Sequence, residues 1–424
     1  MSRWLYFLLI FAVLAILLDL FHVSPILIFI VAALGIVPLA ALIGESVEGV
    51  AEHTGEKIGG LLFATFGNAT ELIISILALS QGLIDVVKAS IIGTILGNAL
   101  LVLGVSVCVG GFKHGRLKFE ARPASQYASL FALCTGSLIL PTIAELLATR
   151  NHQTSIVERG VGLSDFVAVL LLFGYIASIL FSVFHVGDKG EEDEENLDPV
   201  LGARSAAAIM RLLAYRRDLA RSSVPGKTNA LRQIDGTLDA LITEESAKQP
   251  GIIGTTAAGA ELVKTPAAPA HKPPLWRSLA LLTIATVGVA VLSEILVGAI
   301  EPVTAALKWS PAFVGLVFVP LIGGLPEYFN TISMALDKRM GMVLAASAGS
   351  SIQIALLVAP ILVLLSLVMP QRLDLVFSIV EIAVLGLATF LFSEITRDGE
   401  LVWLEGLLLI LLYAMMAGTV FVFG

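Results

Sequence analysis

The sequence has few charged residues. Only 14% of its 424 residues are Asp, Glu, Lys or Arg, whereas 57% are hydrophobic and the mean hydropathy is +0.92. Soluble domains carry about 25% charged residues. The chain therefore has too little polar surface to coat a globule in water, and a soluble fold is excluded.

Cysteine is scarce, and the short signatures of catalysis are missing. Cys108 and Cys134 both lie in apolar runs, where we expect small core residues, and no CxxC pair or Cys/His cluster predicts a zinc or redox site. The sequence also lacks a phosphate-binding Gly-x-x-x-x-Gly-Lys-Ser/Thr, a His-Glu metal motif and a Gly-x-Ser-x-Gly. We predict neither an ATP-driven pump nor an enzyme, and we expect no cofactor and no nucleic-acid partner.

Long stretches contain no charge at all. Glu71 is the single charged residue between Ile58 and Ile84, and residues 89–112 and 340–370 have none. A membrane-spanning helix needs about 20 apolar residues. Because lipid offers the backbone no hydrogen bonds, such runs must be helices or closed barrels, and the alternation of barrel strands is absent. The sequence predicts an all-α polytopic membrane protein.

About 11 transmembrane helices are expected, and Met1–Leu18 is interpreted as part of a retained first helix because no cleavage site follows it. The expected spans are residues 4–21, 25–50, 57–80, 84–112, 124–148, 162–186, 276–299, 310–336, 340–369, 373–394 and 401–423. One polar segment interrupts them, with an acidic cluster at 191–195, an Arg-rich stretch and a flexible tether near 265–274. The predicted parts are a leading helix (1–22), a first five-helix repeat (23–187), a cytoplasmic acidic and basic loop (188–274) and a second five-helix repeat (275–424).

Lys and Arg in short loops predict the orientation in the membrane. With a cytoplasmic N-terminus, nine of these residues lie inside: Arg3, Lys57, Lys113, Arg116, Lys118, Arg122, Lys338, Arg339 and Arg397. Five then lie outside: Lys88, Arg150, Arg159, Lys308 and Arg372. We therefore expect a multi-pass protein of the cell (inner) membrane with its N-terminus in the cytoplasm. The sequence gives no indication of an oligomeric state.

The two halves of the chain repeat. A shift of 256 positions brings Glu71 onto Glu327 and, without a gap, brings several other residues onto identical ones. The matches are Gly67 with Gly323, Ile76 with Ile332, Ala89 with Ala345, Gly93 with Gly349, and residues 99–102 with 355–358. Because each repeat has an odd number of spans, the second is inverted relative to the first. Inverted repeats are typical of transporters, whose site lies near the membrane centre where the repeats meet.

Glu71 and Glu327 lie in the middle of two equivalent spans. A charge at the bilayer centre costs about 2.5–3.5 kcal/mol on insertion scales, and here that cost occurs twice. If inversion brings both carboxylates to one point, their repulsion favours uptake of a proton, and a divalent cation neutralises both. Protons and the cation then compete for the same oxygens, which is the minimum requirement of an antiporter. The alternative is a pair of protonated, hydrogen-bonded carboxyls without function.

Helix breakers and amides accompany the two glutamates. Gly67, Gly323, Gly324 and Pro326 fit interrupted helices whose freed carbonyls face the ion, although close helix packing would explain them as well. The amides are Asn68, one turn before Glu71, and Asn98 and Gln353, which occupy the other pair of equivalent helices. These amides are candidate ligands, and hydrogen bonding between helices is the alternative.

A second group of acidic residues lies nearer the ends of two helices. Glu45, Glu48 and Glu52 share one helix face, and Glu294 and Glu301, seven residues apart, mirror Glu45 and Glu52. A solvated surface is the plain explanation. As a functional alternative, these glutamates relay protons or line the mouth of the pathway.

The motif Gly67-Asn68-Ala69-Thr70-Glu71-Leu72 resembles the first signature of cation/proton exchangers of the CAX type, in the calcium/cation antiporter superfamily. Flanking stretches are similar to those of the same family: Gly59-Gly60-Leu61-Leu62, Gly93-Thr94-Ile95-Leu96-Gly97-Asn98, Ser293-Glu294-Ile295-Leu296-Val297 and Gly349-Ser350-Ser351-Ile352-Gln353-Ile354. The resemblance implies one leading helix plus two inverted five-helix repeats. It implies exchange of Ca²⁺ for H⁺, with Glu71 and Glu327 as ion ligands helped by backbone carbonyls of their motifs.

The second motif departs from the family pattern Gly-Asn-x-x-Glu-His. Gly324 replaces the Asn, Tyr328 replaces the His, and Pro326 is also unusual. One amide and one titratable group are missing, so the choice of cation stays open among Ca²⁺, Na⁺, K⁺ and Mn²⁺. A cation channel is the alternative from another class, but a repeated two-glutamate site favours alternating access over a selectivity ring.

Overall fold

A computed structural model of the chain describes residues 3–54, 61–62, 65–150, 160–182 and 274–423. All of them belong to one compact unit, Met1–Phe184 with Lys272–Gly424. The other unit, His185–His271, lies outside the described residues. The acidic cluster 191–195 and nearly all of the expected loop 188–274 therefore lie there too.

The described residues are almost entirely helical. In chain order the elements are α1 (Arg3–Leu20), α2 (Pro25–Thr54), α4 (Ala69–Ser80), α5 (Ile84–Leu96), η1 (Gly97–Val102), α6 (Leu103–His114), β1 (Leu117–Lys118), α7 (Ala121–Arg150), α9 (Gly160–Ser182), α13 (Leu275–Leu307), α14 (Pro311–Phe313), η2 (Val314–Phe318), α15 (Val319–Leu336), α16 (Met340–Gln353), η3 (Ile354–Val358), α17 (Ala359–Leu365), η4 (Ser366–Val368), α18 (Ile379–Ile395), β2 (Glu400–Leu401) and α19 (Trp403–Phe423).

Consecutive segments, such as α5, η1 and α6, form one continuous helical rod that contains a π-helical turn. Counted in this way, the described residues form 11 rods, and eight of them are long and apolar enough to cross a membrane. Two further helices, Phe7–Leu20 and Ala69–Ser80, are apolar but shorter. The predicted all-α, multi-pass fold is confirmed.

The repeat read from the sequence reappears in the helix boundaries. Three boundaries of the first half recur 256 positions later in the second: α4 and α15 end at Ser80 and Leu336, α5 and α16 begin at Ile84 and Met340, and η1 and η3 end at Val102 and Val358. Helix ends are set by caps and turns as well as by apolar composition, so these agreements add to the sequence identities. The two halves are built from equivalent elements in the same order.

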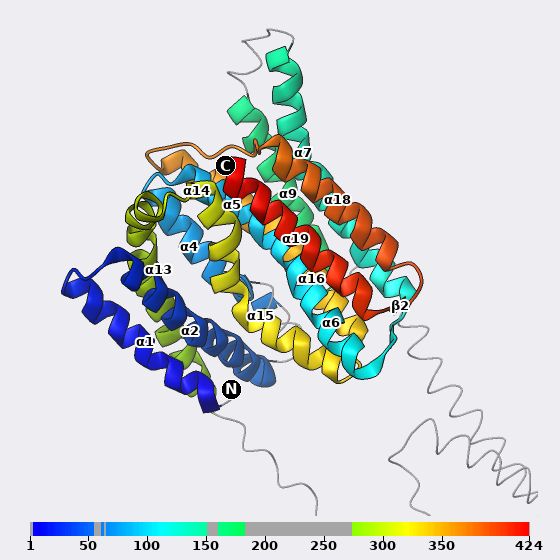
Figure 1. The fold of residues 1–424 in the computed structure, drawn as a ribbon, viewed down its shortest axis with the longest axis horizontal. Helices are drawn as coiled ribbons and strands as arrows, with labels where there is room; N and C mark the ends of the chain where they lie inside the picture. The colour runs from blue at the N-terminus through cyan, green and yellow to red at the C-terminus, as the bar shows by residue number, and fades with distance from the viewer. Residues whose placement is uncertain (1–2, 55–60, 63–64, 151–159, 183–273, 424) are drawn as a thin grey trace, which may run out of the picture. The chain divides into compact units, whose positions relative to one another are not determined.

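Helices α1, α2 and α13 lie side by side and form a layer of their own (Figure 1). Gly35, Gly49 and Gly288 let α2 and α13 approach closely. A Cβ at Gly35 would lie 2.9 Å from Leu292 Cδ1, and one at Gly288 would lie 3.0 Å from Leu39 Cδ1. Small residues at such contacts favour helix association inside lipid, where hydrophobicity gives no driving force. The α2–α13 layer borders α4 and α15, which carry the two central glutamates.

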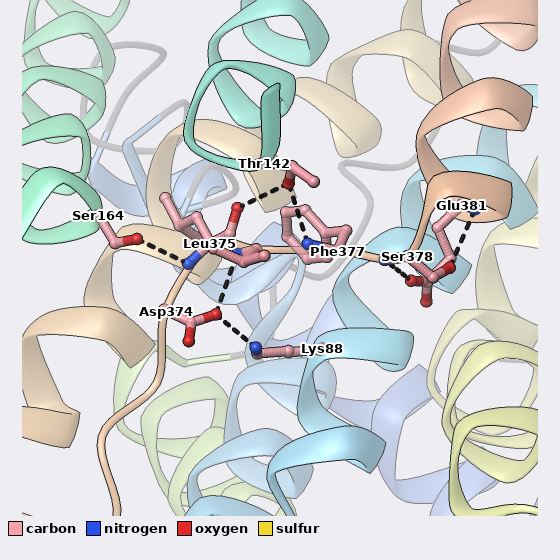
Figure 2. Close-up of polar contacts among 9 residues, drawn as sticks. Lys88, Thr142, Ser164, Asp374, Leu375, Phe377, Ser378 and Glu381 are labelled. Carbon is pink, nitrogen blue, oxygen red and sulfur yellow. Dashed lines mark hydrogen bonds and ion pairs between the residues drawn. The ribbon is translucent and has the colours of Figure 1, made fainter. Parts of the chain in front are cut away.

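The predicted span 373–394 begins too early. Residues 373–378 form an extended strap, and α18 starts only at Ile379. Figure 2 shows how the strap is held by side chains of other helices. The Leu375 amide donates to Ser164 Oγ at 3.0 Å, the Phe377 amide donates to Thr142 Oγ1 at 3.0 Å, and Lys88 pairs with Asp374.

A capping box fixes the start of α18 after the strap. The Glu381 amide donates to Ser378 Oγ at 3.2 Å, and the Ser378 amide donates to Glu381 Oε2 at 2.8 Å (Figure 2). This reciprocal pair satisfies two amides that the first turn of a helix leaves free. The motif Ser378-x-x-Glu381 was therefore the sequence signal for the true helix start.

At the opposite end of these helices, β1 and β2 form a two-stranded antiparallel sheet that joins the α6–α7 and α18–α19 connections. Arg116 pairs with Glu400 across this sheet. His114 Nε2 lies 2.8 Å from the Leu336 carbonyl, at the end of α15. Elements of the first half are thus tied to elements of the second at both ends of the helices.

Candidate cation-binding site

In the first half, the helix that leads to Glu71 is interrupted at Gly67 and Asn68, and α4 begins at Ala69. Asn68 occupies the N-cap position, but its side chain makes no capping hydrogen bond. It reaches α16 instead, where Asn68 Nδ2 donates to Gln353 Oε1 at 2.7 Å. Two of the predicted amides therefore meet across the two halves.

Ser350 of α16 is the centre of the polar network. Asn98 Nδ2 donates to Ser350 Oγ at 2.9 Å, and Ser350 Oγ lies 2.8 Å from both Asn68 Oδ1 and Glu327 Oε1. A serine hydroxyl has one proton and two lone pairs. Ser350 can therefore donate to Asn68 or to an ionised Glu327, but not to both at once.

Glu71 is buried, with 4% of its surface exposed, and it points at α15. A Cβ on Gly323 would lie 2.7 Å from Glu71 Oε1 and 2.9 Å from its Cδ. Gly323 and Glu327 are four residues apart on one helix, so they share a face. The structure therefore brings the Glu71 carboxyl to within one helical turn of Glu327.

One oxygen of this pair has no hydrogen-bond partner within the part of the chain that the structure describes. Glu71 Oε2 is buried and accepts no hydrogen bond from any residue that the structure describes. An unpaired charge in a low-dielectric interior costs far more than a paired one. Glu71 therefore needs a proton or a cation at this oxygen.

The second half differs from the expected interrupted helix. Helix α15 is continuous from Val319 to Leu336, and Pro326 lies inside it. Proline has no N–H, so the carbonyl four residues earlier, that of Ile322, loses its helical donor. Gly323 therefore acts here as room for Glu71, not as a break in the helix.

Gly324 is the repeat counterpart of Asn68. A Cβ at Gly324 would meet nothing closer than 3.9 Å, and Asn98 Oδ1 is one of the two atoms at that distance. At this position the second half has room for a Cβ in ordinary van der Waals contact, where the first half has an amide.

The outer acidic residues do not join the central network. Glu45, Glu48 and Glu52 are exposed on α2, and Glu294 and Glu301 are exposed on α13. Neither α2 nor α13 supplies any of the hydrogen bonds that surround Ser350.

The sequence reasoning gave no role to Ser350, although it is the hub of the site. A signal was present: the shift of 256 places Ser350 on Thr94, so that a hydroxyl follows a glycine in both Gly93-Thr94 and Gly349-Ser350. Apolar matches hide such a pair, because Ser and Thr are also common in membrane helices as packing residues.

Two carboxylates meeting inside a membrane, where inverted helical repeats join, define a secondary transporter. The chain belongs to the sodium/calcium exchanger protein family, whose model matches residues 24–184 and 277–422.

Relatives and solved structures agree with this assignment. The chain is 34% identical to a Ca²⁺/H⁺ antiporter of Synechocystis over 92% of this chain and 89% of that protein. It is 29% identical to the Ca²⁺/H⁺ antiporter ChaA of Bacillus subtilis over 94% and 93%. The structure of native YfkE matches with a TM-score of 0.70 and 26% identity, covering 99% of both chains. The resemblance to CAX-type exchangers is confirmed.

Proposed function

We propose that this protein is a secondary antiporter that exchanges Ca²⁺ for H⁺ across a membrane by alternating access at the Glu71–Glu327 site. The observation that carries the proposal is the buried Glu71 Oε2, which has no hydrogen-bond partner among the described residues and lies one turn of α15 away from a second carboxylate. The names of the curated relatives, Ca²⁺/H⁺ antiporters among them, support the same pair of ions.

The ligand set is made of oxygen atoms, as a hard cation requires. Glu71 and Glu327 supply the charge, and Asn68, Asn98 and Gln353, which belong to the hydrogen-bond network of Ser350, offer amide oxygens. Two glycines also contribute: the carbonyl of Gly67 lies at the interruption before α4 and completes the set, whereas Gly323 makes room for Glu71.

Protons compete with the cation through Ser350. A protonated Glu327 can donate to Ser350 Oγ, which leaves the serine hydroxyl free to donate to Asn68 Oδ1. An ionised Glu327 instead accepts the hydrogen bond of the Ser350 hydroxyl. Asn68 Oδ1 then loses this donor and is free to bind the cation. Loss of the proton thus creates a carboxylate and frees an amide oxygen in the same step.

In this proposal the protein is a transporter and not an enzyme, and exchange needs no cofactor. Its membrane is the cell (inner) membrane, with the N-terminus and the loop 188–274 in the cytoplasm, as the distribution of Lys and Arg favours. Gly324 and Tyr328, which stand where the family has Asn and His, make Na⁺, K⁺ and Mn²⁺ the cations to compare with Ca²⁺.

Transport in everted membrane vesicles tests the proposal. The interior is first acidified, and Ca²⁺, Mn²⁺, Na⁺ or K⁺ is then added outside. Ca²⁺ should collapse the pH gradient and accumulate inside, and neither should occur in vesicles without the protein. Collapse by Na⁺ or K⁺ alone would reassign the cation, and a Ca²⁺ current independent of the proton gradient would replace the antiporter with a channel.

A further inference from the structure

We propose that a phospholipid with an ethanolamine headgroup binds in a cavity at the end of the helices where the strap meets α18. The cavity has a volume of about 360 Å³. Its wall is built from the first turn of α5, from α14, from the strap with the first turn of α18, and from the last turn of α19. No residue of the Glu71–Glu327 site lines it, so the proposal goes beyond ion exchange and does not depend on which ions are transported.

The cavity lies at the boundary of the membrane. Of the helices that are long and apolar enough to cross a bilayer, Ile84–His114 and Pro311–Leu336 begin at its wall, and Trp403–Phe423 ends there. Helix α14 packs against both α5 and α19 at this place (Figure 1). Because the apolar part of a span occupies the hydrocarbon core, the end of a span lies at the level of the phospholipid headgroups.

Part of the wall is apolar and also faces outward. Val380 and Phe423 line the cavity, and they are 37% and 83% exposed, respectively. Val420, one turn before the end of α19, is buried behind them. Exposed apolar side chains at the end of a span contact lipid. An acyl chain can therefore lie against these side chains while its headgroup occupies the cavity, which a free, water-soluble ion would not require.

Two serines in the wall have hydroxyl protons to donate. Ser310 Oγ accepts from the Phe313 amide at 3.1 Å, and Ser378 Oγ accepts from the Glu381 amide at 3.2 Å. Each serine caps a helix through a lone pair of its oxygen, which leaves the hydroxyl proton unused. Neither hydroxyl donates to another residue in the part of the chain that the structure describes. Both are therefore donors for the oxygens of a phosphate.

Lys88 adds a positive charge to these donors. Its side chain lines the cavity and pairs with Asp374 of the strap (Figure 2). A lysine ammonium has three N–H groups, so this pair leaves others free to bind an anion. A phosphodiester next to Lys88, Ser310 and Ser378 would receive charge-assisted hydrogen bonds, which are stronger than neutral ones.

Asp85 explains why the headgroup should also carry an ammonium. Its carboxylate lines the cavity from the first turn of α5, is exposed, and forms no ion pair with another described residue. Glu381 is the other acid of the wall, and its Oε2 accepts from the Ser378 amide. Since Asp374 already neutralises Lys88, an anionic headgroup alone would face uncompensated carboxylates. Ethanolamine offers a primary ammonium to Asp85 beside the phosphate, so both charges are matched.

Lipid binding to the full-length protein tests the proposal. Delipidated protein in detergent is titrated with phosphatidylethanolamine, phosphatidylcholine or phosphatidylglycerol of identical acyl chains, and bound lipid is measured by native mass spectrometry. Phosphatidylethanolamine should bind about threefold or more tightly than the other two, since a partly exposed ion pair with Asp85 is worth up to about 1 kcal/mol. Equal binding of the three lipids would overturn the assignment of the headgroup.

Asp85→Asn removes the partner of the ammonium without breaking a contact of the fold. The affinity for phosphatidylethanolamine should fall about threefold or more, and the affinity for phosphatidylglycerol should not fall. Asp398→Asn, which changes an exposed acid at the other end of the helices, is the control and should alter neither affinity. An unchanged preference for phosphatidylethanolamine in Asp85→Asn would refute the role of this carboxylate.

Thr419→Phe tests whether the lipid occupies this cavity. Thr419 lines it, and its hydroxyl bonds only within α19, to the Met415 carbonyl at 2.8 Å. The new ring should fill the space and reduce phosphatidylethanolamine binding to background. Gly418→Phe is the matched control, because a Cβ at Gly418 meets nothing within 4 Å, and it should bind lipid as the native protein does. Native binding in Thr419→Phe would place the lipid elsewhere.

A soluble competitor distinguishes a lipid from a free headgroup. Glycerophosphoethanolamine has the same phosphate and ammonium but no acyl chains. At a concentration equal to that of the lipid it should not displace phosphatidylethanolamine, because it makes no contact with Val380 and Phe423. Displacement would show that the apolar wall contributes nothing and that the cavity binds a water-soluble phosphate compound instead.

Discussion

Ser351 of α16 donates a hydrogen bond of 3.2 Å to the carbonyl of Ile95 in α5, the residue 256 positions before it. Ile95 is therefore the repeat counterpart of Ser351. A residue can touch its own counterpart only close to the axis that relates the two repeats. Ser350, which joins Asn68, Asn98 and Glu327, is the adjacent residue, so the site lies at this axis.

Removing either central charge should stop exchange. Glu71→Gln and Glu327→Gln keep the side-chain shape but cannot neutralise a cation or release a proton, so transport should fall to background. Unfolding in detergent should change by no more than about 1 kcal/mol, because a buried charge is costly to begin with. Glu394→Gln, at an exposed pair with Arg397, is the control. Transport at the native rate in either central variant would refute the assignment.

Ser350→Ala should weaken exchange far more than it weakens folding. The change breaks three polar contacts and uncouples Glu327 from Asn68. We expect at least a tenfold loss in Ca²⁺ transport, with a flatter dependence on pH. Ser106→Ala is the matched control, since Ser106 is also buried in a span and its hydroxyl has no partner among the described residues. Equal activities of the two variants would remove Ser350 from the site.

Gly323→Ala should displace the Glu71 carboxyl. The new Cβ would lie 2.7 Å from Glu71 Oε1, and a flexible side-chain end can move aside. Folding should therefore be retained while the apparent affinity for Ca²⁺ falls about tenfold or more. At Gly386 a Cβ would meet nothing within 4 Å, so Gly386→Ala should leave transport unchanged. Native Ca²⁺ affinity in Gly323→Ala would contradict the close approach.

Gly324→Asn should restore symmetry to the site. The position has room for a Cβ, and its repeat counterpart is Asn68. A further amide oxygen beside Asn98 adds a ligand that Ca²⁺ favours. We expect a severalfold lower half-saturating Ca²⁺ concentration in the vesicle assay, with an unchanged yield of folded protein. A loss of affinity would show that the site needs a residue without a side chain at this position.

Thr142→Val should loosen the strap before α18. Thr142 Oγ1 accepts from the Phe377 amide at 3.0 Å and donates to the Leu375 carbonyl at 3.3 Å (Figure 2). Leaving a buried amide without a partner costs about 1–3 kcal/mol. Hydrogen exchange at residues 375–381 should accelerate, and the protein should unfold several degrees lower. Thr283→Val, whose hydroxyl bonds only within its own helix, should show neither effect.

The sequence was sufficient for the helices and for the central pair because both depend on local or periodic signals. Apolar length predicts a span, and a fixed shift of 256 positions pairs Glu71 with Glu327. The prediction that a span begins at residue 373 was wrong for the opposite reason, because residues 373–378 form a strap whose structure depends on distant partners. Its amides are satisfied by Ser164 and Thr142, on helices more than 200 residues earlier, and no local pattern announces such partners.

Two other features depended on contacts across the halves. Gly323 was predicted to offer a carbonyl to the cation, and that stays a prediction; the structure adds that Glu71 occupies the space in which a side chain at this position would lie. The role of Ser350 depends on the packing of α16 against α4, α15 and η1, which brings its hydroxyl to Asn68, Glu327 and Asn98. Residue type and spacing can suggest ligands, but they do not show which of these side chains are hydrogen-bonded to one another.

Pro326 and Gly324 have a further effect on the energy of the transport cycle. If the two repeats were identical, exchanging their conformations would convert the form open to one face into the form open to the other, and both forms would have equal free energy. Asn68 has no amide counterpart at position 324, and Pro326 deprives only α15 of a backbone bond. The two forms therefore differ in energy, and a protein at rest without ions must favour one side of the membrane.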